Sequence, residues 1–96
     1  MIKIIGNDLY RAGEKIGYMD TKHVWGHDGK KLGYFDDRTV WGEDGRKLAF
    51  IDGDFLISYG ASGEESKVRL ETMNEQVEGG VMPGIQKCAV YVLLGE

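Results

Sequence analysis

Short apolar groups alternate with glycine-rich polar stretches along the first seventy residues. Segments 24–25 and 32–35 are rich in aromatic and branched side chains, which strands favour. Between and after them lie the tripeptides His-Asp-Gly at 27–29 and Glu-Asp-Gly at 43–45. Two residues in a type I turn followed by a left-handed glycine close a tight hairpin, because only glycine adopts positive φ at little cost. The pattern predicts a meander of short antiparallel strands.

These strands belong to one repeated unit. Residues 13–28 read GEKIGYMDTKHVWGHD and residues 29–44 read GKKLGYFDDRTVWGED, so nine of sixteen positions are identical. A third copy opens at Gly45, a decayed fourth covers residues 57–70, and residues 9–13 match the end of a unit with one residue deleted. Self-similarity at a fixed period marks a repeat architecture. We therefore predict four hairpin units over about residues 7–70.

Apolar side chains occur on both faces of each predicted hairpin. Leu32 and Tyr34 share one face, whereas Phe35 lies on the other beside the small Gly33, as strand alternation requires. A sheet with one wet side would alternate cleanly, and a lone hairpin is only marginally stable in water. The units are therefore expected to pack in a closed ring, with the last unit meeting the first. The repeated glycine is expected to make room for a Trp or Tyr ring of the next unit.

The character of the chain changes after Leu70. Residues 71–80 are polar and end in glycine, so we expect a fraying strand followed by a loop. Beyond Pro83, five apolar residues fall at helical spacing, with Gly95 as a C-terminal stop: Ile85, Cys88, Ala89, Val92 and Leu93. The spacing favours a helix, but the branched and aromatic run 90–92 also suits a buried strand, and both stay open.

A segment that is apolar nearly all round belongs to a core or an interface. As a helix, it would turn Val90, Tyr91 and Leu94 away from the apolar stripe, where a monomer leaves them exposed. We expect these three residues to form an interface, most simply that of a symmetric dimer. The alternative is that the segment plugs an opening in the ring of its own chain.

Composition and charge narrow the class of protein. A chain of 96 residues, 42% apolar and 29% charged, suits a single domain over residues 1–96. The longest apolar run, residues 88–94, is too short to span a membrane, and the N-terminus lacks the pattern of a signal peptide. The single cysteine fits a reducing compartment, so we expect a cytoplasmic protein. The net charge of −4 points to no nucleic-acid partner.

Four aromatic residues are predicted to occupy equivalent places around the ring: Tyr10, Trp25, Trp41 and Tyr59. Aromatic faces presented in series can stack on sugars, bases or peptide prolines. The same rings would also fill the gaps between hairpins, and we predict this packing role for them. A ligand-binding surface is the alternative, and it requires that the two tryptophans be solvent-exposed.

The remaining candidate groups do not make a site pattern. His23 and His27 do not recur in the next unit, so no metal site is predicted. Aspartate recurs at the end of one strand in each unit and is expected to hold the following turn: Asp20, Asp36 and Asp52. Cys88 has no basic neighbour in sequence and is expected to be buried. No catalytic residue and no cofactor is predicted, and we expect the chain not to be an enzyme.

The unit G-x-K-[LI]-G-[YF]-x-D, preceded by an aromatic residue and a glycine-closed turn, resembles the four-fold β-flower proteins, small bacterial domains of four hairpin petals. The resemblance covers about residues 7–70; it implies a fold and carries over no activity. The expected fold class is mainly β: four tandem antiparallel β-hairpin repeats packed in a ring, followed by a short C-terminal helix. The expected function is a structural or protein-interaction module that contacts a partner protein or a second copy. The alternative is small-ligand or glycan binding through exposed aromatic residues.

Overall fold

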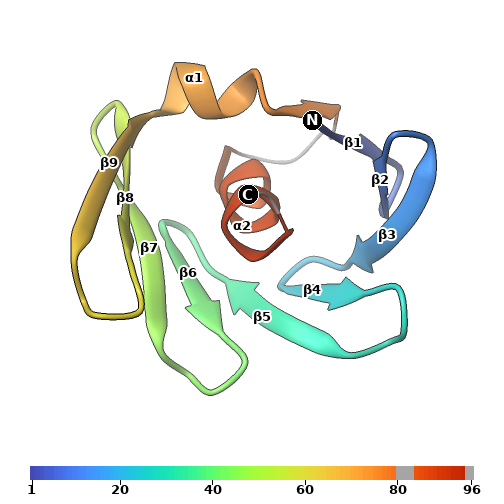
Figure 1. Cartoon of the computed structure of the whole chain (residues 1–96), viewed down its shortest axis with the longest axis horizontal. Helices are drawn as coiled ribbons and strands as arrows, with labels where there is room; N and C mark the ends of the chain where they lie inside the picture. The colour runs from blue at the N-terminus through green and yellow to red at the C-terminus, as the bar shows by residue number, and fades with distance from the viewer. Residues whose placement is uncertain (80–83, 95–96) are drawn as a thin grey trace.

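A ten-stranded sheet curls around a C-terminal helix in the computed structural model, which describes residues 1–79 and 84–94 (Figure 1). The strand order is β10-β1-β2-β3-β4-β5-β6-β7-β8-β9, and neighbours from β1 to β9 pair antiparallel. The strands are β1 (Ile2–Ile5), β2 (Asp8–Arg11), β3 (Glu14–Met19), β4 (His23–Gly26), β5 (Lys31–Phe35), β6 (Thr39–Gly42), β7 (Lys47–Asp52), β8 (Phe55–Tyr59), β9 (Glu65–Arg69) and β10 (Val77–Gly79). The helices in this part of the chain are α1 (Leu70–Asn74) and α2 (Gly84–Leu94). The predicted fold class, hairpin repeats in a ring followed by a helix, is confirmed.

The hairpin tips contain the predicted turn. Gly29 and Gly45 adopt φ angles of 83° and 86°. The Gly29 N–H donates to the Gly26 carbonyl at 3.0 Å, and the Gly26 N–H donates to the Lys30 carbonyl at 2.8 Å. These two bonds close a type I turn with a glycine bulge. The first hairpin is one residue shorter, and Ala12 itself takes a positive φ of 53° there.

The ring closes through α1 and β10, because the first and last hairpins do not pair with each other. α1 spans the gap between β9 and β10 (Figure 1), and β10 pairs parallel with β1, placing Val77 opposite Ile2. The expectation of strand and loop over residues 71–80 is therefore wrong as far as Gly79, and Gly80 lies outside the described residues. α1 buries Met73 alone, and β10 buries Val77 alone. Elements with a single buried side chain have no periodicity to reveal them in the sequence.

The concave face of the sheet and α2 together form the core. Alternate strand residues point inward, and Val24 and Val40 among them have no exposed surface. α2 lies inside the ring (Figure 1), where it contacts β4 to β7, β10 and α1. A helix rather than a strand is confirmed here, whereas Pro83 and Gly95 lie outside the described residues. Val90 is 0% exposed, so its assignment to an interface is wrong: a helix enclosed by a ring has no outward face over this stretch.

The small inner-face residues make room for backbone and helix. A Cβ at Gly33 would overlap the carbonyl oxygen of Trp41 and come within 3.0 Å of the Leu93 side chain of α2. The expected role of this glycine, to accommodate a Trp or Tyr ring, is wrong because the rings lie on the other face. Leu32 packs against the core instead of sharing the face of Tyr34. A bulge between β4 and β5 gives β5 an extra residue and reverses the direction of that side chain.

Candidate binding surface

The outward-facing strand residues form rungs across neighbouring strands. Strand register places Trp25 between Tyr18 and Lys31. The next unit repeats this rung with Tyr34, Trp41 and Lys47, and the third has Phe50, Ile57 and Lys67. An incomplete rung at the N-terminal side consists of Lys3, Tyr10 and Lys15. We call the outward face of β2 to β9, with these rungs and the rings of Phe55 and Tyr59, the convex surface.

Rings within a rung stack on each other. The centroids of Tyr18 and Trp25 lie 5.8 Å apart with an interplanar angle of 10°, and those of Tyr34 and Trp41 lie 6.1 Å apart at 15°. The Lys31 ammonium lies 5.3 Å from the Trp25 centroid. Because Tyr18 and Lys31 belong to strands on either side of β4, they cover opposite sides of this indole. Each such aromatic or cation–π contact contributes about 0.5–1.5 kcal/mol, so the rungs are ordered by their own contacts.

The four predicted ring residues occupy equivalent positions in their hairpins. Tyr10, Trp25 and Trp41 each lie opposite the lysine that follows the tip glycine by two residues. Tyr59 lies opposite Glu65, which takes the place of that lysine in the fourth hairpin, and it stacks on Phe50. The Gly60 N–H donates to the Glu64 carbonyl as the Gly42 N–H donates to the Arg46 carbonyl, so Tyr59 and Trp41 precede the same turn. Tyr59 remains on the convex surface.

Trp25 and Trp41 do pack between hairpins, each against a tyrosine of the preceding hairpin, but they do so on the outward face and not in the core. All four predicted ring residues are half-buried on the outward face, and the concave core is filled by aliphatic and small side chains. Ile57, 3% exposed, is buried on the outward face and lies outside the core cluster. Sequence reasoning missed the stacking partners Tyr18, Tyr34 and Phe50. Their recurrence three residues after a lysine in each unit was the available signal.

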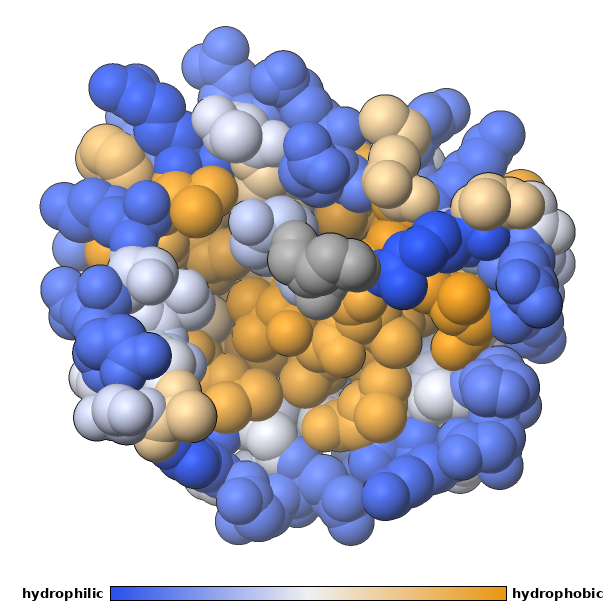
Figure 2. Space-filling view, in the orientation of Figure 1, coloured by the Kyte–Doolittle hydropathy of each residue, from blue (hydrophilic) through white to orange (hydrophobic). Residues whose placement is uncertain are grey.

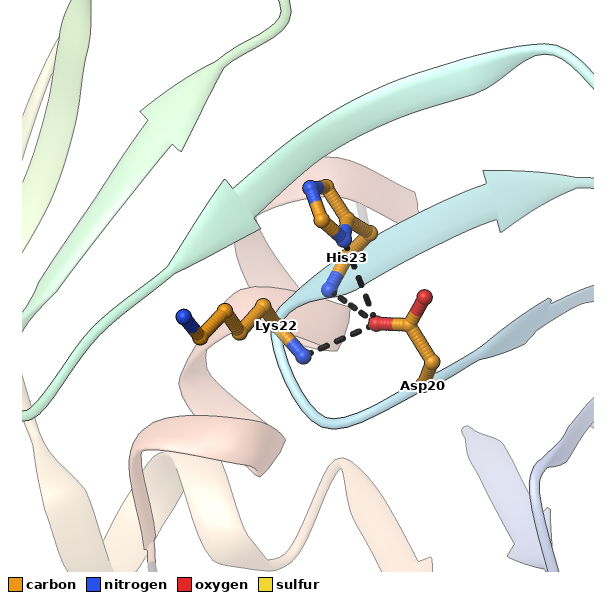
Figure 3. Close-up of polar contacts among 3 residues, drawn as sticks. All are labelled: Asp20, Lys22 and His23. Carbon is orange, nitrogen blue, oxygen red and sulfur yellow. Dashed lines mark hydrogen bonds and ion pairs between the residues drawn. The ribbon is translucent and has the colours of Figure 1, made fainter.

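Aspartates hold the turns that join the hairpins, as predicted for Asp20 and Asp36. Asp20 Oδ1 accepts hydrogen bonds from the backbone N–H groups of Lys22 at 2.8 Å and His23 at 2.6 Å (Figure 3). Asp36 holds the next turn in the same way and also accepts the indole N–H of Trp41 at 3.2 Å. Partial burial acts to raise the pKa of both carboxyl groups, but these hydrogen bonds keep each pKa below its usual 3.8.

Other chemically active groups do not converge. His23 Nδ1 lies 3.3 Å from Asp20 Oδ1, whereas His27 is exposed beyond the opposite end of β4. Among residues 1–79 and 84–94, no three His, Cys, Asp or Glu side chains gather into a group that could hold a metal ion. Asp52 is exposed at the end of β7. Burial raises the pKa of the Cys88 thiol to about 12, which keeps it protonated and makes it a packing residue.

A pocket of about 480 Å³ lies where two inter-hairpin turns meet the start of α2. Its lining includes the His23 and Tyr34 side chains and Ile85 of the helix. Of the three recurring aspartates, Asp36 alone lines it, and that carboxylate is already bonded to the turn. The pocket therefore does not gather the three recurring aspartates into a shared site, as acid–base chemistry between them would need.

The end of the ring at which α2 finishes is apolar. Figure 2 shows hydrophobic residues at its centre, surrounded by hydrophilic ones. Tyr91 and Leu94 are half-buried against the core on the last turn of α2. The Arg11 guanidinium donates a hydrogen bond to the Leu94 carbonyl, an interaction that the negative end of a helix favours. Tyr91 and Leu94 keep part of their surface open, and the dimer interface expected of them stays a prediction.

Within the described residues, no helix is long and apolar enough to cross a membrane. Residues 5–80 match the family model described as 4-fold beta flower protein. No curated protein and no solved structure matches the chain. The matched residues contain β2 to β10, and hence all of the hairpin petals, whereas α2 lies beyond them. With most of its length matched and its hairpins arranged as petals around a ring, the chain belongs to the 4-fold beta flower family.

Proposed function

We propose that this chain is a non-enzymatic binding module and that the convex surface contacts its partner. The observation that carries the proposal is the placement of the aromatic residues. Apart from Phe35 and Tyr91, every Tyr, Trp and Phe side chain of the chain lies half-buried on the convex surface. Partly exposed aromatic clusters are typical of binding surfaces, because a ring offers a large contact area with few rotatable bonds.

The self-contacts of the rungs support a binding role. Tyr18 on Trp25 and Tyr34 on Trp41 hold four rings in fixed orientations before any partner arrives. Ordering side chains on association costs about 0.5–1.5 kcal/mol for each one immobilised. Rings that are already ordered lose less conformational entropy on binding, so the convex surface is preorganised.

The groups on the convex surface suit contact rather than catalysis. Lysine ammonium groups and tyrosine hydroxyls accompany the rings, and Asp8 is paired with Lys15 at 3.1 Å. A catalytic site needs a nucleophile or a general base with a matched pKa in a shared pocket. The pocket that touches this face through His23 and Tyr34 lies beside a carboxylate that the turn already uses.

The test uses the two tryptophans, both of which lie on the convex surface, as intrinsic reporters. Wild type is applied to immobilised acidic and neutral polysaccharides, single-stranded DNA and peptides, beside Trp25→Ser/Trp41→Ser and the control Tyr91→Ser. We expect retention of wild type on one of these classes, a shift of its emission on binding, and loss of retention in the double variant alone. Circular dichroism checks that each variant is folded. Retention on no class, equal retention of the double variant, or binding of wild type without an emission shift would overturn the proposal.

A further inference from the structure

Three lysines of the convex surface have no ion-pair partner among residues 1–79 and 84–94. The net charge of the chain is −4, but many of its acidic residues lie in turns, where Asp28 and Asp44 each accept a backbone N–H at 3.0 Å. Of the carboxylates on the outward face, Asp8 is paired with Lys15 and Glu65 lies opposite Tyr59. Lys31, Lys47 and Lys67 lie on strands, and among the described residues none has a carboxylate within ion-pair distance. The negative net charge of the whole chain therefore does not describe the convex surface, which is locally basic and suits an anionic partner.

The same three lysines stand in a spaced row. They come from β5, β7 and β9, which are alternate strands, and the register offsets each lysine from the next by three residues along the strand. For strands about 4.8 Å from each other and about 3.3 Å per residue, their Cα atoms are roughly 14 Å apart on a diagonal. Each ammonium lies over a different ring, at 5.3, 4.4 and 4.8 Å from its centroid: Lys31 over Trp25, Lys47 over Phe50 and Lys67 over Phe55. A small anion reaches one of them at a time. A polymer with successive anionic groups contacts all three and gains from multivalent attachment.

The rings decide which polyanion fits. Proteins that bind single-stranded nucleic acid stack its bases on open aromatic faces. Trp25 has Tyr18 against one face and the Lys31 ammonium over the other, so this indole, beside the first of the three lysines, leaves no face for a base. An acidic sugar polymer has no base to insert. Its anionic groups pair with lysine, and its hydroxyl groups hydrogen-bond with the tyrosine hydroxyls of the same rungs.

We propose that the convex surface binds a linear acidic polysaccharide, with anionic groups along the polymer on Lys31, Lys47 and Lys67 and its hydroxyl groups hydrogen-bonded to the tyrosine hydroxyls of the rungs. The inference rests on the proposed function, that the convex surface is the binding surface, and adds the chemistry of the ligand. Charge complementarity and the spacing of the lysines are the observations that select it.

The experiment titrates the full chain with polygalacturonate and follows tryptophan emission. The variant Lys31→Gln/Lys47→Gln/Lys67→Gln is compared with Lys22→Gln/Lys30→Gln/Arg46→Gln, which removes three positive charges from the turns instead. An exposed ion pair contributes about twofold to fivefold in affinity, so the first variant is expected to bind about tenfold more weakly and the second to match wild type. Binding by wild type is expected to weaken as salt is raised.

Dextran, oligo-dT and polyglutamate are titrated in parallel. Equal weakening in both triple variants would mean general electrostatic attraction and overturn the inference. Tighter binding of oligo-dT or polyglutamate than of polygalacturonate would assign the surface to nucleic acid or to an acidic protein, and the proposed function would stand without this ligand. Binding of dextran alone would have the same meaning. If wild type binds none of the titrated polymers and is retained on none of the immobilised ligands, both proposals are overturned.

Discussion

Gly33→Ala tests whether the inner-face glycines are required by backbone packing. The added Cβ would overlap the Trp41 carbonyl oxygen on β6, which is a backbone atom and cannot move by a change of rotamer. It would also meet the Leu93 methyl groups at 3.0 Å, so α2 limits relaxation on that side. Overpacking of this kind costs about 1–3 kcal/mol. Alanine also restricts the unfolded chain, which stabilises by about 0.4–1 kcal/mol and partly offsets the cost. We expect a net destabilisation of about 1–2 kcal/mol.

Urea unfolding followed by tryptophan fluorescence measures the difference in unfolding free energy between wild type and Gly33→Ala. In thermal unfolding, the midpoint of a domain of this size is expected to fall by about 5–15 °C. Gly42→Ala is the matched control, because its Cβ would meet movable side-chain atoms, Asp44 Oδ1 at 3.1 Å and Leu48 Cδ1 at 3.5 Å. Ala49, at the equivalent place of the third unit, already carries a Cβ and is fully buried. If Gly33→Ala proves as stable as Gly42→Ala, the close approach of β6 and α2 does not fix this position.

Three further changes probe the turns and the helix. Gly29→Val is expected to cost about 1–2 kcal/mol, because a branched residue is strained at a φ of 83°, and an unchanged midpoint would contradict the turn type. Partial burial acts to raise the pKa of Asp36, but hydrogen bonds from the turn and from Trp41 lower this pKa below 3.8. The carboxylate therefore stabilises the fold above pH 3.8, and its contribution is lost as the pH falls through the lowered pKa. The unfolding free energies of wild type and Asp36→Asn are therefore expected to differ at neutral pH and to converge below pH 3.8; parallel curves would refute this role. Tyr91→Asp/Leu94→Asp is expected to destabilise the isolated chain, since α2 fills its ring; a folded variant whose mass by light scattering halves would instead establish the dimer.

The hairpins could be predicted from the sequence because the residues that determine a hairpin tip lie close together along the chain. The glycine at positive φ and the aspartate that accepts turn N–H groups lie within four residues of the atoms they organise, and both recur with the repeat. Ring closure could not be predicted from the sequence, because α1 and β10 each bury a single side chain, Met73 and Val77, and β10 pairs with β1 at the other end of the chain. A side chain whose only partners are distant leaves no local pattern.

Part of the candidate binding surface could be predicted from the sequence. The repeat located Tyr10, Trp25, Trp41 and Tyr59 at equivalent places, since equal spacing from the tip glycine gives equal positions. Strand alternation shows that Trp25 and Val24 face opposite ways, but it does not show which of them meets the core. That choice depends on the position of α2, which no residue near either strand specifies. Register is also non-local: β8 and β9 pair without the bulge of the two preceding hairpins, which puts Lys67 opposite Ile57.

Curvature explains why the rings face outward. In a sheet curled around one helix, side chains converge on the concave face and diverge on the convex face. The concave face accordingly holds Gly17, Gly33 and Ala49 at equivalent places, and the two glycines cannot accept a Cβ without overlapping a carbonyl oxygen of the neighbouring strand. Rings the size of Trp25 fit where side chains diverge, and the space between rungs admits a lysine beside each. One repeat therefore sets a small residue inside and a large one outside in successive petals. The fold thereby produces a regular array of rings and cations on which an extended partner can bind.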